Sequence, residues 1–253
     1  MKTIIMLATT VTCLAASLPA NSQAPAQGDQ VFILATYFHC NSATVQRADD
    51  AVDKVYKKTL EGLVSAGTVS SYGWLGKFVG GEWLRAGYFT GSKLEDVLAA
   101  SVNVPLPRSD DHPKMDRKAI DENCSSGEDY VWHVLAGSKP GAPRGKVSFS
   151  IYYVCDQTRE TQADALVKNI LAARYDELVT QKKLISTWAW AEHIIGGKYR
   201  RLSTMSAESL DKLIDAREAL VAGEEHDPVS QAMTSICGSH QDVIWEVLNQ
   251  GGR

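Results

Sequence analysis

An internal repeat constrains the fold of this chain more than any other feature of its sequence. The segment WLGKFVGGEWLR (residues 74–85) returns as WAEHIIGGKYRR (residues 190–201), 116 positions later. Outward from these segments the agreement continues in the same order, with TYFHC matching IYYVC, RADDAV matching QADALV, and CSSGEDYVWHVL matching CGSHQDVIWEVL. A match of this length with preserved order indicates a tandem duplication.

The duplication predicts four parts in the chain. Residues 1–26 are expected to be a signal peptide, 27–136 a first repeat, 137–146 a linker and 147–253 a second repeat. The expected linker, GSKPGAPRGK, is rich in glycine, proline and basic residues, which favour an irregular connection.

Each copy has the pattern of a β-α-β-β-α-β unit. Strands are expected at residues 31–38, 69–78, 83–89 and 129–135 in the first copy, and at 147–154, 185–195, 199–205 and 242–248 in the second. A long helix with an apolar stripe at helical spacing follows the first strand. The double glycines 80–81 and 196–197 suit the tight turn of a hairpin, because glycine accepts positive φ. This order is that of the ferredoxin-like unit.

The first strand indicates how the two units are combined. Ile33, Ala35 and Tyr37 lie on one face and Leu34 and Phe38 on the other, so neither face is polar and both are expected to be covered. In the second copy Ser148 and Ser150 interrupt one face. We therefore predict an α+β fold in which two tandem ferredoxin-like repeats pack their antiparallel sheets into one fused α+β barrel.

With this order, duplication and patterning, the chain resembles the dimeric α+β barrel superfamily, in the subset where two fused repeats supply both halves of the barrel. The resemblance covers nearly all of the chain after residue 26. It implies a fold much more strongly than an activity. Members of the superfamily include haem-handling enzymes and cofactor-free oxygenases, so the resemblance also allows an oxygenase.

The start of the chain predicts export. Lys2 is followed by an apolar run and then by small residues, with Ala24 and Ala26 in an A-x-A arrangement, which is the pattern of a secretory signal peptide. The expected location is therefore periplasmic or secreted. A net charge of -4 gives no electrostatic reason to expect nucleic acid or an anionic membrane as a partner, and no later stretch is apolar enough to span a bilayer.

Four cysteines remain beyond the expected signal peptide, two at matching places in each copy. The first and last strands of a ferredoxin-like unit are antiparallel neighbours, so the end of one lies beside the start of the other. An oxidising compartment and an even count favour disulfides over metal. We predict Cys40–Cys124 and Cys155–Cys237; the alternatives are four free thiols or cross-links between the copies.

Three histidines are weak candidates for catalysis, because histidine titrates near neutral pH. His39 ends the first strand of copy one and His133 lies in the neighbouring last strand, so the two could approach each other. His193 lies beside the second double glycine, where the first copy has Lys77. A structural role is the alternative for each. A lone histidine is also a weak haem signal, and there is no CxxCH attachment sequence.

Two repeated pairs are weak candidates for ligand binding: Trp74 with Trp190, and Arg85 with Arg201. Each guanidinium could hold a carboxylate or phenolate ligand. The alternative that we favour is an internal ion pair, for which Asp129 and Asp242 recur in both copies. The tryptophans are expected to fill the core, with an aromatic pocket as the alternative.

No metal site is predicted, although SDDHP (109–113) and EEHDP (224–228) place carboxylates beside a histidine. Consecutive residues seldom converge on one ion, and such stretches are usually solvated loops.

No catalytic signature is present. We therefore expect an exported protein that binds a small apolar or aromatic molecule in the barrel, or an interaction module. The alternative is a cofactor-free or haem-handling oxygenase. No cofactor is required by the first hypothesis, whereas haem belongs to the second.

Overall fold

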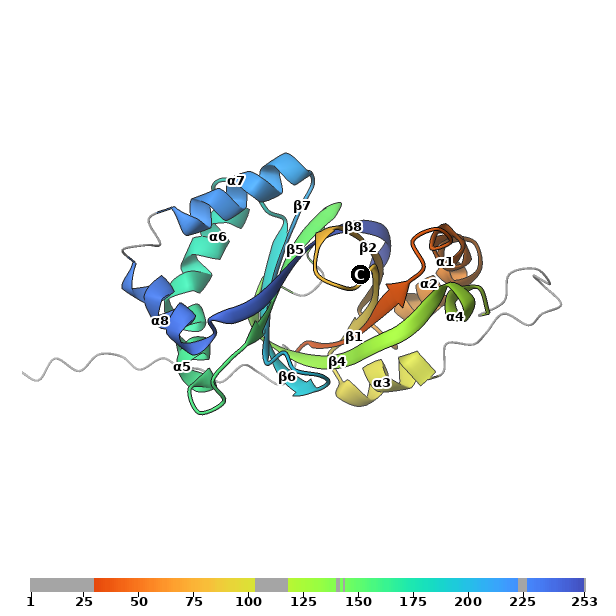
Figure 1. Cartoon of the computed structure of the whole chain (residues 1–253), viewed down its shortest axis with the longest axis horizontal. Coiled ribbons are helices and arrows are strands. Elements are labelled where there is room, and N and C mark those ends of the chain that lie inside the picture. Colours follow the sequence, from red (N-terminus) through yellow and green to blue (C-terminus); the bar gives the residue numbers. More distant parts are fainter. Residues whose placement is uncertain (1–29, 103–117, 140–141, 143, 223–226, 253) are drawn as a thin grey trace, which may run out of the picture.

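A computed structural model describes residues 30–252 apart from 103–117, 140–141, 143 and 223–226. The expected signal peptide therefore lies outside the described residues. Two sets of helices flank a central barrel of strands (Figure 1). No helix in the described part of the chain combines the length and apolar character that a membrane crossing requires.

The first repeat contains four strands and the helices that cover them. Its elements are β1 (Phe32–Cys40), α1 (Gln46–Ala51), the π-helical turn η1 (Val52–Tyr56), α2 (Lys57–Ala66), β2 (Ser71–Gly80), β3 (Arg85–Gly91), α3 (Leu94–Val102), α4 (Lys118–Asn123) and β4 (Cys124–Gly137). Gly67, with φ 77°, ends α2 in the left-handed conformation that favours glycine at a helix C-terminus.

The second repeat has the same order. Its elements are β5 (Val147–Val154), α5 (Glu160–Leu166), the π-helical turn η2 (Val167–Leu171), α6 (Ala172–Thr180), β6 (Thr187–Ile195), β7 (Arg201–Ala207), α7 (Leu210–Val221), α8 (Pro228–Ile236) and β8 (Ser239–Gly252). The long first helix is broken by a π-helical turn at the same place in both copies, so the duplication extends to this irregularity.

The eight strands form one closed antiparallel barrel in the order β1-β3-β2-β8-β5-β7-β6-β4. Each repeat contributes four neighbouring strands in the ferredoxin-like order. The two sheets join edge to edge, where β2 pairs with β8 and β4 pairs with β6. The prediction of a fused α+β barrel is confirmed, and closure leaves neither sheet with an unpaired edge.

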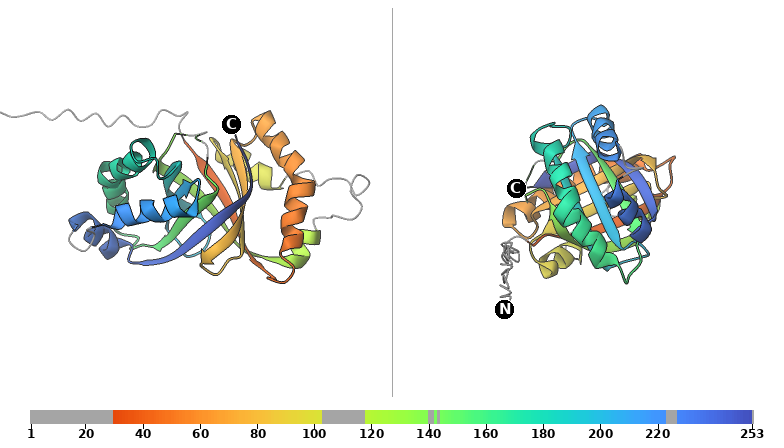
Figure 2. Two further views of the ribbon diagram at one scale, coloured as in Figure 1. Left: turned by 90° about the horizontal axis from the view of Figure 1, so that it is seen from above. Right: turned by 90° about the vertical axis from the view of Figure 1, so that its left-hand side faces the viewer.

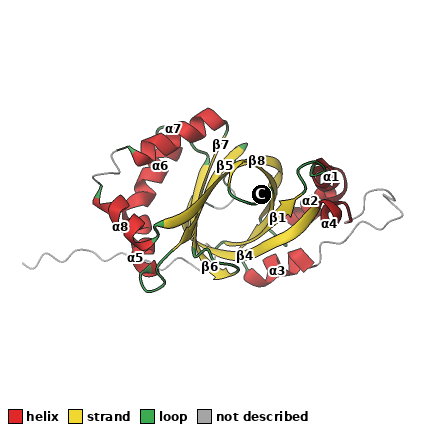
Figure 3. Cartoon of the chain, viewed as in Figure 1, coloured by secondary structure: helices red, strands yellow, loops and turns green. Residues whose placement is uncertain are grey.

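The barrel lies between two layers of helices, one from each repeat (Figures 2 and 3). The apolar outer face of each sheet packs against its own helices and forms a separate core. The barrel interior is a third core, and it is dominated by eight buried aromatic side chains: Tyr37, Trp83, Tyr88, Tyr130, Trp132, Tyr152, Tyr199 and Trp245. This is why the first strand is apolar on both faces.

The two repeated motifs are hairpins, as predicted, and they occupy the same end of the barrel. Gly80 and Gly81 have φ of 85° and 56°, which β-carbon-bearing residues rarely adopt. The aromatic residue after each double glycine, Trp83 or Tyr199, enters the barrel, where the two ring centroids lie 5.8 Å apart. The motif thus recurs because each copy closes its half of this end with one aromatic side chain.

Both predicted disulfides are present. Cys40 is bonded to Cys124 and Cys155 to Cys237, with Cα–Cα distances of 3.9 and 4.0 Å. Cys40 and Cys124 are paired residues of the adjacent strands β1 and β4, which is the strand neighbourhood on which the prediction relied. The cross-links between copies are therefore excluded.

Candidate functional site: a cavity at one end of the barrel

The end of the barrel opposite the double-glycine hairpins holds a cavity of about 550 Å³. Strands β1, β2, β3, β4, β6, β7 and β8 contribute to its wall, and both described ends of the chain, Gln30 and Gly252, border it. Its floor includes Ile33, Tyr88 and Val134, which belong to the aromatic core of the barrel or pack against it. The barrel is therefore filled at one end and hollow at the other.

The cavity lining mixes apolar side chains, among them Val31, Ile33 and Val134, with seven serine and threonine residues. Ser71 and Thr90 share a hydrogen bond of 2.6 Å between their side-chain oxygens, and Thr204 is hydrogen-bonded to Ser148 at 3.0 Å. The hydroxyl of Tyr88 is buried and has no hydrogen-bond partner among the described residues. An unsatisfied buried hydroxyl is costly, and this one lies against Gly73 in the barrel wall.

Described residues of the connection between the repeats border the cavity, and both ends of the connection are attached to the barrel. Ser138 exchanges two hydrogen bonds with the backbone of Trp188, of 2.9 and 3.0 Å. At the other end the amide of Val247 donates to the carbonyl of Lys146 at 2.8 Å, and Gly145 lies so close to Ala207 that a β-carbon would collide with its carbonyl. Arg144 directly precedes the second attachment, at Gly145 and Lys146.

Arg144 places its guanidinium 4.4 Å from the centre of the Tyr88 ring, in a cation–π contact. Among the described cavity-lining residues the charged ones are Arg144 and Lys139, and none of these described residues is acidic. The mouth of the cavity is therefore positively charged. Sequence reasoning missed this feature because the connection occurs once in the chain and no repeat marks Arg144.

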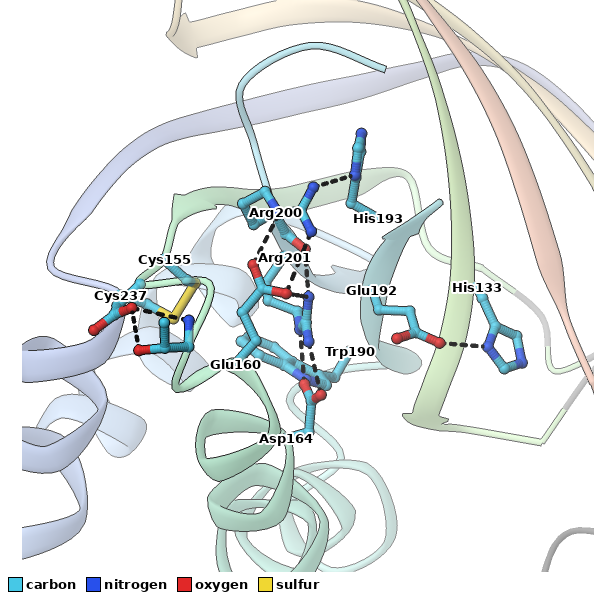
Figure 4. Close-up of polar contacts among 12 residues, drawn as sticks. His133, Cys155, Glu160, Asp164, Trp190, Glu192, His193, Arg200, Arg201 and Cys237 are labelled. Atoms are coloured by element: carbon cyan, nitrogen blue, oxygen red, sulfur yellow. Dashed lines mark hydrogen bonds and ion pairs between the residues drawn. A yellow bond between two sulfur atoms is a disulfide. The ribbon is translucent and has the colours of Figure 1, made fainter. Parts of the chain in front are cut away.

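The repeated arginines do not line this cavity; they form internal ion pairs behind the barrel wall, and Figure 4 shows the one around Arg201. Arg201 binds both oxygens of Asp164, at 2.7 and 2.8 Å, and also Glu160 at 3.1 Å. Trp190 donates its indole N–H to the same Asp164 at 2.8 Å. The guanidinium of Arg201 is 3% exposed, so this network is part of the core.

The first repeat has a smaller version of the same network. Arg85 binds both oxygens of Asp49 at 2.7 Å, and Trp74 donates to Asp49 at 2.8 Å. The favoured alternative of an internal ion pair therefore agrees with the structure. The expected partners, Asp129 and Asp242, were wrong, because the arginine side chains point outward to the first helix of each repeat.

A signal for the correct partners was present in the sequence. Asp49 and Asp164 occupy equivalent positions in RADDAV and QADALV, on the apolar side of a helix where an acid is unexpected. Trp74 is buried against Asp49 and Trp190 against Asp164. The two tryptophans therefore fill the outer cores and do not form an aromatic pocket with each other.

The three histidines are not brought together. His39 pairs with Ser125 and His133 with Phe32, at opposite ends of the β1–β4 ladder, so the proposed approach of His39 to His133 was wrong. His39 is exposed. His133 stacks on Phe32, and its Nδ1 lies 2.9 Å from a carboxylate oxygen of Glu192.

His193 lies against the rings of Tyr130 and Trp132 at the filled end of the barrel. Arg200 donates a hydrogen bond of 2.9 Å to its Nδ1. Burial, and then the charge of Arg200, lower the pKa of His193 below its ordinary value, so the ring is neutral at pH 7. None of the three histidines lines the cavity.

The two acidic, histidine-containing segments fall largely outside the described residues. Of the acidic and histidine residues in these segments, Asp227 is described. It caps α8 and forms an ion pair of 2.7 Å with Arg174. Among the residues that the structure describes, no group of three or more His, Cys, Asp or Glu side chains is arranged to hold a metal ion.

Comparison with known proteins supports the fold. No protein-family model matches the chain, and no curated protein matches it. Among solved structures it is similar to a proposed monooxygenase from Lactobacillus acidophilus (TM-score 0.59, 9% identity, 88% of this chain and 96% of that one). It is also similar to an anthrone oxidase-like protein (TM-score 0.54, 12% identity, 88% of this chain and 93% of that one). A third similar structure is a proposed dyp-type peroxidase from Shewanella oneidensis (TM-score 0.53, 8% identity, 86% of this chain and 93% of that one).

The architecture and the cavity define a class of protein: an eight-stranded antiparallel barrel, built from two fused ferredoxin-like repeats and hollow at one end. This is the fold of the dimeric α+β barrel proteins, with both halves of the barrel supplied by one chain. At identities of 8–12% this likeness establishes the fold alone.

The cavity does not fit a haem group. Histidine, cysteine and methionine, the usual protein ligands of haem iron, are absent from its described lining. Tyrosine can also ligate haem, and Tyr72 and Tyr88 line the cavity. The hydroxyl of Tyr72 donates a hydrogen bond to Asn249, and the Tyr88 ring is covered by Arg144 on one side and lies against Gly73 at its edge. His133 has the carboxylate partner that often orients a ligating histidine, yet the cavity does not extend to it.

Proposed function

We propose that this protein is an exported binding protein that holds one small molecule with an apolar or aromatic body in the cavity at the open end of the barrel. The observation that carries this proposal is the division of the barrel interior, which is packed with aromatic rings at one end and holds about 550 Å³ at the other. Ligand sites are typically apolar cavities of this size with a few polar groups.

Three further observations support the proposal. The cavity is bordered by strand ends, by both described ends of the chain and by the connection, and no helix of the described residues lines it. The two disulfides are compatible with an oxidising compartment, as export requires. Similarity to an anthrone oxidase-like protein is in keeping with an aromatic ligand.

The alternative, an oxygenase, has support from the names of the structural neighbours alone. The proposed general bases lie elsewhere: His39 on the surface, His133 on the outer side of β4 and His193 at the filled end. A binding function requires nothing more than the cavity itself.

Titration with the neutral fluorescent probe N-phenyl-1-naphthylamine tests the proposal. Ala189 lines the cavity on β6, and Ala189→Phe would fill part of it. The matched control is Ala165→Phe, on the exposed side of α5. We expect saturable binding at one site per chain in the parent and the control, and at least tenfold weaker binding in Ala189→Phe at an unchanged melting temperature. Equal binding by all three proteins would refute the cavity as the site.

A further inference from the structure

We propose that the ligand is an organic anion, an apolar or aromatic body carrying one carboxylate, and that Arg144 binds this carboxylate at the mouth of the cavity. This inference rests on the proposed function and adds the chemical class of the ligand.

The first argument is the state of Arg144 compared with the other arginines of the barrel. Arg85 and Arg201 each bind both oxygens of an aspartate, and Arg200 binds Glu160 at 2.8 Å. Arg144 forms no ion pair with any described residue; it makes a cation–π contact with the Tyr88 ring. A guanidinium over an aromatic face is held in place but keeps its N–H donors for another acceptor.

The second argument is the charge of the cavity. Lys139 is exposed and Arg144 half-buried, both border the cavity, and no acidic side chain among the described lining residues offsets them. A cation beside an apolar, low-dielectric cavity is attracted to an anion more strongly than the same cation in water. A neutral ligand would form no ion pair with these cations.

The third argument concerns the Tyr88 ring, over which the guanidinium lies. Tyr88 is 6% exposed, and its hydroxyl is buried against Gly73. The guanidinium is therefore the donor of this pair that is available to a ligand in the cavity. Carboxylates accept several hydrogen bonds, and a planar guanidinium suits the two oxygens of one carboxylate.

The position of Arg144 is also defined by the fold. Gly145 and Lys146 are fixed against β7 and β8, so the backbone that carries Arg144 does not depend on the ligand for its placement. A positioned donor loses less entropy on binding than a mobile surface side chain. The connection between the repeats thus carries the group that selects the ligand.

A pair of competitors with the same ring tests the inference. 1-Naphthoate and 1-naphthamide differ in charge and hardly in shape, and each is used to displace N-phenyl-1-naphthylamine from the parent, from Arg144→Gln and from Arg217→Gln. Arg217 is the matched control, because it lies 6.0 Å from the Phe149 ring on the outer side of the barrel.

In the parent and in Arg217→Gln, we expect 1-naphthoate to displace the probe at a concentration at least tenfold lower than 1-naphthamide. In Arg144→Gln this ratio should fall to near one, while the affinity for the neutral probe changes less than threefold, and Arg144→Lys should restore part of the ratio. An unchanged ratio in Arg144→Gln, or no preference for 1-naphthoate in the parent, would overturn the inference and leave the binding function standing. Loss of the neutral probe from Arg144→Gln would also overturn it, since Arg144 would then act by packing. Failure of the proposed function itself is recognised separately, by probe binding that Ala189→Phe does not weaken.

Discussion

The buried network around Arg201 allows a quantitative prediction for the variant Arg201→Met. Methionine has a similar length and no charge, so it removes the guanidinium and leaves Asp164 in the core. The carboxylate of Asp164 would then keep one described hydrogen bond, from the indole N–H of Trp190. Removing one partner of a buried ion pair typically costs 3–5 kcal/mol, because the remaining charge is uncompensated.

We expect Arg201→Met to lower the free energy of unfolding by about 3–5 kcal/mol. For a chain of this size each kcal/mol corresponds to about 2–4 °C, so the melting temperature should fall by roughly 10 °C. The equivalent change in the first repeat, Arg85→Met, should cost less. Arg85 is 12% exposed and binds one carboxylate, that of Asp49, whereas Arg201 is 3% exposed and binds two, those of Asp164 and Glu160.

A double variant tests whether Arg201 and Asp164 contribute to the free energy of unfolding as a coupled pair. Asp164→Leu alone leaves the buried Arg201 with one carboxylate partner, Glu160 at 3.1 Å, and should also be destabilising, whereas Arg201→Met with Asp164→Leu removes both charges of the pair together. The double variant leaves the indole N–H of Trp190 without its acceptor, a cost of about 1–3 kcal/mol. The cost of the double variant should therefore be well below the sum of the two single costs.

Urea unfolding followed by circular dichroism, under non-reducing conditions, measures all four proteins. If Arg201→Met costs less than about 1 kcal/mol, or if the two single costs simply add in the double variant, the network is not a coupled, desolvated unit and the reasoning is refuted.

Three further predictions follow from the barrel. Replacing Cys155 and Cys237 by alanine opens a loop of 82 residues, for which the chain-entropy model gives about 4–5 kcal/mol of lost stability in urea unfolding; a loss below about 1 kcal/mol would contradict that account. The fragments 27–136 and 147–253 should each fail to unfold cooperatively as monomers, because each sheet would expose two edges; two stable monomeric halves would argue against one cooperative barrel. Burial raises the pKa of Tyr152 to about 12, above the unfolded value of about 10, so stability present below pH 10 should be lost as the pH rises toward 12. Tyrosinate absorbance and unfolding should then appear together. Titration of all tyrosines while the protein is still folded would contradict this prediction.

The location of this protein is a prediction of the sequence that the fold leaves open. The expected signal peptide, residues 1–26, is outside the described part of the chain, while the disulfides are compatible with export. The division of the chain into two repeats and a linker remains a proposal from the sequence. The fragment experiment tests whether either repeat folds without the other.

The sequence by itself determined the duplication, the ferredoxin-like order of each copy, the hairpins and the disulfides. These features depend on local patterns that occur twice: apolar spacing, double glycines and cysteines at matching strand ends. Two copies of one pattern restrict the fold far more than one does, and strands apolar on both faces indicated that both faces were covered.

Only the tertiary structure decided the partners of the arginines, the separation of the histidines and the position of the cavity. Asp49 is 36 residues from Arg85 in the sequence, and pairing them depends on which side of the sheet each side chain faces. His39 and His133 lie on neighbouring strands but at opposite ends, because antiparallel register sets their separation. The cavity and Arg144 arise where seven strands and the single connection meet, and no local pattern along the chain records that meeting.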